Sequence, residues 1–245
     1  MGNMNLLLVG YGAMNKRVAA LAKNRGHTIV GVVSPVDTPD CPYPLFSSFE
    51  ESLPSADVAI DFSHPNLTKD MLSSELSIPM VIATTGEKET LVKMMEEKAD
   101  SAPVFFSANM SYGVHILTQL LQTVAPMMDD YDIELIEKHH NQKIDAPSGT
   151  LVKLLDAITE EARPDGNPVY DRSRVSEKRA KEDIGISTIR GGTIVGEHEV
   201  LFAGVDEVIS IKHTAQSKDI FANGALNVAK KLINKDNGFY TYTNL

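Results

Sequence analysis

The sequence predicts an α/β protein of two domains: a doubly wound parallel sheet, and a smaller α+β domain with a mixed or antiparallel sheet. Two observations support this fold class. In the first 110 residues, short apolar runs typical of buried strands alternate with stretches of helical periodicity. Beyond them the alternation stops, and residues 185–215 predict a meander of three strands with turns at 191–192 and 204–206. This change of pattern indicates a second domain.

Five apolar runs predict the strands of the parallel sheet. Residues 5–9 form the first strand, and a glycine turn, a helix that Gly26 would end and a strand at 27–33 follow. A strand, a helix and a second strand within about 30 residues make a βαβ unit. Because helices connect the parallel strands, both faces of such a sheet are covered. The remaining strands are predicted at 57–63, 79–86 and 103–111.

The second domain is expected to begin with a helix that ends near Pro126. An alternating strand follows at 131–140, in which Ile133, Leu135 and Glu137 share one side. Apolar residues at helical spacing predict another helix over 151–158, and residues 164–183 predict a polar loop.

The last helical pattern, residues 219–233, is expected to pack on the first domain. The first domain, which would bind a dinucleotide, then comprises residues 1–110 and is completed by 217–245. Residues 111–216 form the second domain.

The composition argues against several classes of protein. The chain of 245 residues has 23 Lys and Arg against 33 Asp and Glu, a net charge of −10, and no basic block, so nucleic-acid binding is not expected. Cys41 is the only cysteine, which excludes an internal disulfide and a thiolate metal site. The apolar run near the N-terminus is too short for a signal peptide or a membrane span. We therefore expect a cytoplasmic protein that does not bind membranes.

The turn "VGYGAMN" lies between a predicted strand and a predicted helix. Glycines at positions 10 and 12 would let the backbone approach a pyrophosphate, whose charge then lies on free N–H groups of the helix. The third glycine of the dinucleotide-binding fingerprint should be residue 15, which is Asn15 here. Dinucleotide binding is the favoured interpretation, and a simple tight turn is the alternative.

The choice between NADH and NADPH stays open. Ser34 stands where an acid would bind the ribose hydroxyls of NAD, and the next acid, Asp37, lies beyond a proline. Without a carboxylate at that place a 2′-phosphate would not be repelled, and Lys16 or Arg17 could attract it.

Two further loops follow strands of the same sheet, "ATTGE" at 83–87 and "SANMS" at 107–111. Ligands of such sheets bind outside the carboxyl ends of the strands, so these loops suit the wall of a cofactor site. Ordinary turn chemistry explains the same residue types equally well.

The stretch "EKHHNQKIDAPSGT", residues 137–150, contains two adjacent histidines, a lysine and a predicted helix start. In a regular strand His139 and His140 would point to opposite faces, so both reach one site only if the strand ends there. A zinc site would need a third and a fourth ligand, for which no cysteines and no H-E-x-x-H spacing are available. Surface histidines beside a solvated lysine are the other alternative.

The favoured interpretation of this stretch is a site for an acidic substrate. Pro147 and Ser148 would start a helix, whose first N–H groups, near Gly149 and Thr150, can hold a carboxylate. Lys143 and His140 would complete that site, and the other histidine would be free for proton transfer near neutral pH.

The same stretch resembles the signature E-x-H-H-x-x-K-x-D-A-P-S-G-T of the 4-hydroxy-tetrahydrodipicolinate reductase (dihydrodipicolinate reductase) family, with every fixed position present. "ATTGE" is similar to that family's G-T-T-G loop, and "SANMSYGV" to its A-x-N-x-S-x-G-V segment. "RGGTIVGEHEVLFAG" and "FANGAL" resemble its C-terminal motifs. The matches span nearly the whole chain.

The resemblance implies a Rossmann-type domain followed by a mixed-sheet substrate domain, usually assembled as a homotetramer through the second domain. It also implies NADH- or NADPH-dependent reduction of the cyclic dicarboxylate 4-hydroxy-tetrahydrodipicolinate to tetrahydrodipicolinate with loss of water. This oxidoreductase step belongs to diaminopimelate and lysine biosynthesis.

By the same resemblance, His139 and Lys143 would be catalytic, and His140, Gly149 and Thr150 would bind the substrate carboxylates. The implied cofactor-binding residues are Gly10, Tyr11, Gly12, Ala13, Met14, Asn15, Ala83, Thr84, Thr85, Ser107, Ala108, Asn109 and Met110. No metal is implied.

Three positions depart from the family pattern. Asn15 replaces the third glycine in a turn that is one residue shorter than usual, and Ser34 replaces the ribose-binding acid. Ala83 replaces the first glycine of G-T-T-G, which changes little if its backbone φ is negative. Two other functions are compatible with the fold: an NAD(P)-linked dehydrogenase for an amino acid or a semialdehyde, and a non-catalytic dinucleotide sensor.

Overall fold

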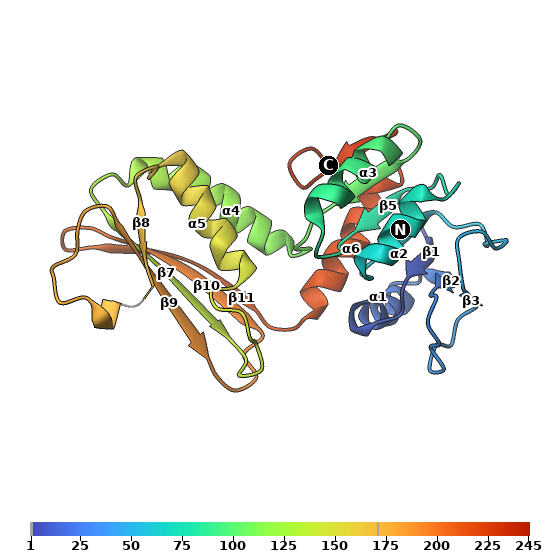
Figure 1. Ribbon diagram of the computed structural model, residues 1–245, viewed down its shortest axis with the longest axis horizontal. Coiled ribbons are helices and arrows are strands. Elements are labelled where there is room, and N and C mark those ends of the chain that lie inside the picture. Colours follow the sequence, from blue (N-terminus) through green and yellow to red (C-terminus); the bar gives the residue numbers. More distant parts are fainter. Residues whose placement is uncertain (1, 171) are drawn as a thin grey trace. The chain divides into compact units, whose positions relative to one another are not determined.

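The structure is a computed structural model that describes residues 2–170 and 172–245, and these form two compact units (Figure 1). The first unit consists of the chain up to Met110 together with Asp219–Leu245, and the second of Ser111–Lys218. The chain therefore leaves the first unit once and returns to it.

The first unit is built on a seven-stranded sheet in the order β12-β6-β5-β4-β1-β2-β3, in which every neighbouring pair is parallel. Its central strands are buried along almost their whole length, as expected for strands covered on both faces. The strands are β1 (Asn5–Val9), β2 (Thr28–Val33), β3 (Leu45–Phe46), β4 (Val58–Asp61), β5 (Met80–Ile82), β6 (Pro103–Phe106) and β12 (Gly238–Tyr240). The sequence predicted five of them and missed the short edge strands β3 and β12.

Four helices cover the two faces of this sheet: α1 (Ala13–Asn24), α2 (Pro65–Ser73), α3 (Lys88–Lys98) and α6 (Asp219–Leu232). Successive residues of β1 point to opposite faces. Leu6 and Leu8 pack in one apolar cluster with α1 and α6, whereas Leu7 and Val9 pack in another with α2 and α3. The predicted doubly wound sheet is confirmed.

Helix α6 packs on the first unit, as predicted, and it contacts α1 most extensively. Small residues allow this close packing. A Cβ added at Gly224 would lie 1.8 Å from the backbone oxygen of Met110, far closer than non-bonded atoms approach each other. Position 224 therefore requires glycine because of space.

The second unit contains a mixed five-stranded sheet in the order β11-β10-β7-β9-β8. Strand β7 pairs parallel with β9 and antiparallel with β10, and β10 also pairs antiparallel with β11. The strands are β7 (Asp132–His139), β8 (Asn167–Val169), β9 (Asp183–Arg190), β10 (Gly196–Ala203) and β11 (Val208–Ala215).

The predicted three-strand meander is wrong in its first connection. β9 and β10 are not neighbours, because β7 lies between them. Two strand spacings are roughly 10 Å, which the five residues between Arg190 and Gly196 easily span. The glycine turn crosses the end of β7, since Gly191 N donates to His139 O over 2.9 Å. The second turn, which joins β10 to β11, is a hairpin as predicted.

Helices α4 (Tyr112–Val124) and α5 (Gly149–Glu161) lie on one side of this sheet (Figure 1). Short 3₁₀ turns follow at Ala125–Met127 and Arg172–Arg174, and the latter, with β8, occupies the predicted polar loop. Ile133 and Leu135 of β7 point into the cluster that these helices cover. The alternation of β7 places Glu137 and His139 on that same covered side.

None of the helices in residues 2–170 and 172–245 combines the length and the hydropathy that crossing a membrane requires.

We predict that Gly224→Ala destabilises the protein. Alanine in an exposed helix interior is normally about 1 kcal/mol better than glycine, but here the added carbon meets the Met110 backbone, so the net effect is a loss of roughly 1–3 kcal/mol. Urea unfolding measures it. Gly191→Ala, where no atom lies within 4 Å of the added carbon, is the matched control. A stabilised Gly224→Ala variant would contradict the packing argument.

Candidate active site

The first unit brings four loops to one edge of its sheet. Because all its strands are parallel, the turns after β1, β4, β5 and β6 emerge at the carboxyl edge, where ligands of such sheets bind. Gly10 has a φ of +74°, and a Cβ there would lie 3.0 Å from Cβ of Ser63 in the turn after β4. Two independent constraints thus require glycine at position 10.

Gly12 is the N-cap of α1 and offers no side chain to the N–H groups of the first helical turn. Those groups are available to an anion, and the exposed backbone from Gly12 to Ala13 leaves room for one. The turn therefore fits the pyrophosphate of a dinucleotide.

Asn15 does not face that space. Its side chain is buried, and Nδ2 donates to the backbone oxygens of Val9 at 2.7 Å and Gly10 at 2.8 Å. The amide thus ties the first turn of α1 to the end of β1. Where the fingerprint uses a third glycine for close packing, this chain uses a side-chain hydrogen bond.

The groups considered for cofactor choice all have protein partners. The Ser34 hydroxyl donates to Val36 O at 3.0 Å. Lys16 forms an ion pair with Asp40, and Arg17 forms one with Asp219 at 2.6 Å. The ammonium of Lys16 holds the pKa of Asp40 below its usual value. Because both cations already pair with carboxylates, neither indicates binding of a 2′-phosphate, and the structure favours neither NADH nor NADPH.

The loop after β5 is anchored by a buried acid that the sequence analysis missed. Asp61, at the end of β4, has no exposed surface and accepts hydrogen bonds of 2.7 Å from Ser63 N and from the Thr68 hydroxyl. The Thr68 and Thr84 hydroxyls are also 2.7 Å apart. Burial raises the pKa of Asp61, against the effect of these hydrogen bonds. Its signal in the sequence was an acid that ends an otherwise apolar strand.

The predicted cofactor residues of these two loops divide into exposed and buried groups. Thr85 and Ala108 are exposed, whereas Thr84 and Met110 are buried, and the Met110 oxygen accepts a 2.7 Å hydrogen bond from Tyr242. The Ser107 hydroxyl donates to Asn109 O at 2.7 Å within its own turn. Ala83 is not among the non-glycine residues with positive φ, so an alanine is tolerated there without strain.

In the second unit, β7 ends at His139, which is the condition under which the two histidines can reach one site. His139 is buried on the covered side and His140 is half-buried just beyond the strand. Lys143 follows in the turn, and its ammonium lies 2.6 and 2.8 Å from the two oxygens of Asp145. That ammonium holds the pKa of Asp145 below its usual value.

The predicted helix start is present. Ser148 is the N-cap of α5, and its hydroxyl accepts from Leu151 N at 3.2 Å. Gly149 and Thr150 are the first helical residues, and nothing lies within 4 Å of a Cβ placed on Gly149. Gly149 is exposed at the start of α5, where an anion can approach its backbone.

Glu137 is a central residue whose role the sequence analysis missed. It is fully buried, both its oxygens lie 3.1 Å from Ser148 N, and Arg190 donates to Oε1 at 2.7 Å. Arg190 also donates to the backbone oxygen of Asp145. Burial works to raise the pKa of Glu137, but the hydrogen bonds from Ser148 and Arg190 outweigh it and hold the pKa below its usual value. The ionised carboxylate thus joins β7, β9 and the turn before α5.

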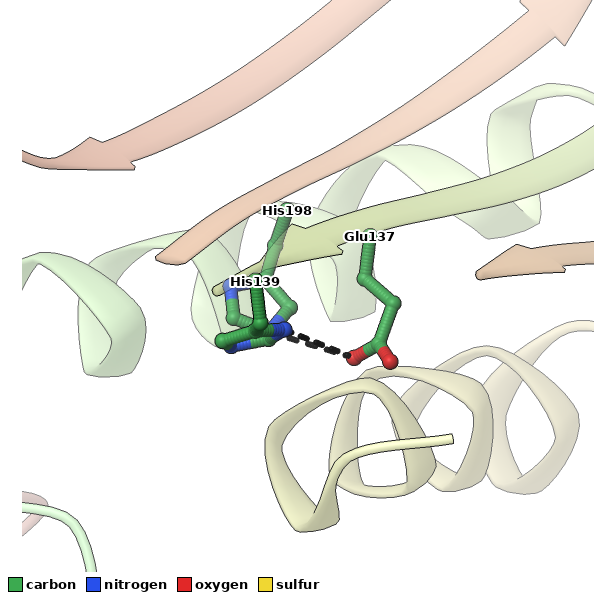
Figure 2. A group of neighbouring side chains, drawn as sticks. All are labelled: Glu137, His139 and His198. Carbon is green, nitrogen blue, oxygen red and sulfur yellow. Dashed lines mark ion pairs between the residues drawn. The ribbon is translucent and has the colours of Figure 1, made fainter. Parts of the chain in front are cut away.

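His198 is the second missed residue. Figure 2 shows His139 and His198 each pointing a ring nitrogen at Glu137. His139 Nδ1 lies 3.7 Å and His198 Nε2 3.8 Å from the same oxygen, Oε2. His198 Nε2 is also 3.2 Å from the Ser148 hydroxyl, and the two imidazoles pack edge to face. Cross-strand register explains the placement, because His198 of β10 pairs directly with Glu137 of β7.

Burial lowers the pKa of both imidazoles. That of His198 falls to about 4, and the nearby His139 lowers it further than Glu137 can raise it. For His139 the same burial outweighs the opposing charge of Glu137. Both rings are therefore neutral at neutral pH.

Glu137, His139 and His198 also form a group whose ligand atoms lie within 4.8 Å of one another, close enough to hold a metal ion. The sequence argument against zinc, which asked for a third and a fourth ligand, did not consider Glu137 and His198 among them. A different argument favours a site without metal: Arg190 and the Ser148 amide already compensate the carboxylate charge.

A doubly wound dinucleotide-type sheet, joined to a second unit that has a histidine, a lysine and a helix start close together in sequence, is typical of two-domain nicotinamide-dependent oxidoreductases. The chain belongs to the dihydrodipicolinate reductase family. Models described as "Dihydrodipicolinate reductase, N-terminus" and "Dihydrodipicolinate reductase, C-terminus" match residues 4–110 and 113–245.

Relatives named 4-hydroxy-tetrahydrodipicolinate reductase include those of Staphylococcus haemolyticus, 57% identical over 242 residues, and Staphylococcus aureus N315, 58% identical. Each match covers 99% of this chain and 100% of the relative. Among solved structures, the dipicolinate-bound dihydrodipicolinate reductase of Paenisporosarcina sp. TG-14 has a TM-score of 0.76 at 20% identity, covering 98% of both chains. The diaminopimelate dehydrogenase of C. glutamicum shares the fold, with a TM-score of 0.59 at 13% identity, over 98% of this chain and 93% of its own.

We predict that His198 makes the protein sensitive to acid. Its pKa is about 4 in the folded state against 6.5 in the unfolded chain, so only the unfolded chain takes up this proton as the pH falls through 6.5. Stability is complete above pH 6.5, and about 3 kcal/mol is lost by pH 4 through this group. Urea unfolding of the wild type and His198→Asn from pH 8 to pH 4 measures the loss. Identical pH dependence in the two proteins would contradict the assignment.

Proposed function

We propose that the protein is an NAD(P)H-dependent oxidoreductase that reduces 4-hydroxy-tetrahydrodipicolinate to tetrahydrodipicolinate with loss of water, in diaminopimelate and lysine biosynthesis. The observation that carries the proposal is the complete signature from His139 to Thr150, folded as a strand end, a turn and an open helix start. The relatives of that name, 57–58% identical over their whole length, support it.

The substrate would be held by its two carboxylates. One fits the N–H groups at Gly149 and Thr150, where the helix dipole adds favourable charge. His140 and Lys143 would assist. The Paenisporosarcina structure contains dipicolinate, a planar cyclic dicarboxylate, and this chemistry fits the same helix start.

When bound, the nicotinamide supplies a hydride, and addition to a conjugated unsaturated imine builds negative charge that a proton must neutralise. The Lys143 ammonium would donate that proton, and His139 would act as donor or acceptor. Asp145 orients the ammonium in the turn, and its own exposure lets it move aside for a substrate carboxylate. The acid–base residues lie in the second unit and the dinucleotide turn in the first, so we assign cofactor to one unit and substrate to the other.

The protein requires a nicotinamide dinucleotide, and we propose NADH or NADPH in that role. The turn from Gly10 to Asn15 would bind the pyrophosphate, with backbone groups of Gly10, Gly12 and Ala13 nearest to it. Ala83–Thr85 and Ser107–Met110 would line the nicotinamide side. We also propose that the protein forms a homotetramer through its second unit and that it is cytoplasmic.

We predict that Lys143→Ala lowers kcat by about two orders of magnitude, because a well-placed proton donor contributes 10²- to 10⁴-fold, roughly. Cofactor binding, measured by NADPH fluorescence, stays unchanged. Ile144→Ala is the matched control, because Ile144 is the next residue in the chain and its side chain is 99% exposed. Normal turnover of Lys143→Ala would remove the lysine from the mechanism.

The function itself is tested by NADPH and NADH oxidation, with the substrate generated from pyruvate and aspartate semialdehyde by the preceding synthase. Oxidation that depends on the synthase establishes the reductase, and the ratio of rates gives the cofactor preference. An amino-acid or semialdehyde dehydrogenase would instead turn over its own substrate without the synthase. A dinucleotide sensor would bind cofactor, catalyse nothing and ignore pyridine-2,6-dicarboxylate.

A further inference from the structure

We propose that Glu137 is a positioning residue for His139: it holds the imidazole with its proton on Nδ1, so that Nε2 is the nitrogen that exchanges a proton with the substrate. The proton exchange rests on the proposed function. The tautomer follows from the geometry alone.

The Glu137 carboxylate is a fixed charge. It has no exposed surface, and its orientation is determined by the Ser148 amide on both oxygens and by Arg190 on Oε1. Arg190 is itself held by the Asp145 backbone oxygen. The carboxylate therefore cannot rotate away, and Oε2 is the oxygen left facing the two imidazoles.

His139 presents Nδ1 to that oxygen at 3.7 Å. Nδ1 is buried and has no hydrogen-bond partner among residues 2–170 and 172–245. An N–H at this nitrogen is attracted by the fixed negative charge, whereas a lone pair there would be repelled, and burial strengthens both effects. The distance exceeds that of a hydrogen bond, and we expect it to shorten when the ring gains a proton during turnover.

The opposite edge of the ring lies against a glycine. A Cβ added at Gly196, the first residue of β10, would lie 3.1 Å from Nε2 and 3.3 Å from Cδ2 of His139. Any side chain at this position would crowd the nitrogen that the tautomer leaves basic. The Nδ1 edge of the His139 ring thus faces the Glu137 carboxylate, and the Nε2 edge has free space because residue 196 is glycine.

Besides Glu137, the charged and titratable groups near His139 are Arg190 of β9, Lys143 and His140 of the turn, and His198 of β10. The cations lower the pKa of His139, and Glu137 is the group that raises it. His198, with a pKa of about 4, stays neutral and is tied to the Ser148 hydroxyl. It therefore does not replace Glu137 as the orienting charge.

The tautomer is tested directly by ¹⁵N NMR of the full-length protein labelled at histidine, with the His139 signals assigned by their loss in His139→Gln. At a pH where the ring is neutral, we expect a pyrrole-type signal at Nδ1 and a pyridine-type signal at Nε2. The opposite pattern in the wild type would overturn the proposal. This measurement needs no Glu137 variant, so a variant that fails to fold cannot obscure it.

Glu137→Gln then tests the cause. We expect the Nε2–H tautomer to gain population, the pKa of His139 to fall and kcat to drop at least about tenfold, with KM for the cofactor unchanged. Glu137→Asp should restore part of each effect. Glu199→Gln, the same change on the adjacent strand β10, is the matched control. An unchanged tautomer ratio in a folded Glu137→Gln would overturn the role of Glu137.

Gly196→Ala separates the two edges of the ring. We expect its kcat to fall while the Nδ1–H tautomer is retained, and unchanged kcat would overturn the assignment of Nε2. The NMR result also stands apart from the proposed function. If the wild type shows the Nδ1–H tautomer yet oxidises no NAD(P)H with the synthase-generated substrate, the proposed function alone fails.

Discussion

The second unit depends on one buried ion pair, that between Glu137 and Arg190. An ionised carboxylate without exposed surface is costly unless an opposite charge and hydrogen bonds compensate it, and here Arg190 and the Ser148 amide do so. Those partners come from a neighbouring strand and from the start of a helix. The charge therefore fixes the end of β7, the turn that contains Lys143 and the N-terminus of α5 relative to one another.

The sequence predicted those parts of the fold whose pattern lies within one segment of the chain, and it failed where segments far apart in sequence pair with each other. Apolar runs and helical periodicity identified the long strands and the helices of both units, because each pattern is contained in its own segment, whereas the short strands β3, β8 and β12 were missed. The meander failed because the insertion of β7 between β9 and β10 is a long-range pairing, which a glycine turn cannot report. The site divides in the same way. Residues 139–150 were found in one motif, whereas His198 reaches the site only through its register opposite Glu137.

In the first unit, the structure explains how the chain tolerates its departures from the family pattern. Asn15 fills the place of a glycine with an amide that bonds to the backbone on either side of the strand end. Asp61 likewise holds Thr84 by buried hydrogen bonds: its carboxylate accepts from the Thr68 hydroxyl, which is hydrogen-bonded to that of Thr84. Side chains thus hold the loops from within, and the backbone and small exposed residues remain for contact with a dinucleotide.

The return of the chain to its first unit has a consequence for its synthesis. On the ribosome, the first 110 residues emerge long before α6, although α6 covers the face of the parallel sheet that contains Leu6, Leu8 and Phe105. The second unit is contiguous and can complete its core earlier. Until its last helix is made, a nascent chain therefore carries a sheet face that α1 covers only in part, and the apolar surface still exposed makes this intermediate prone to aggregation.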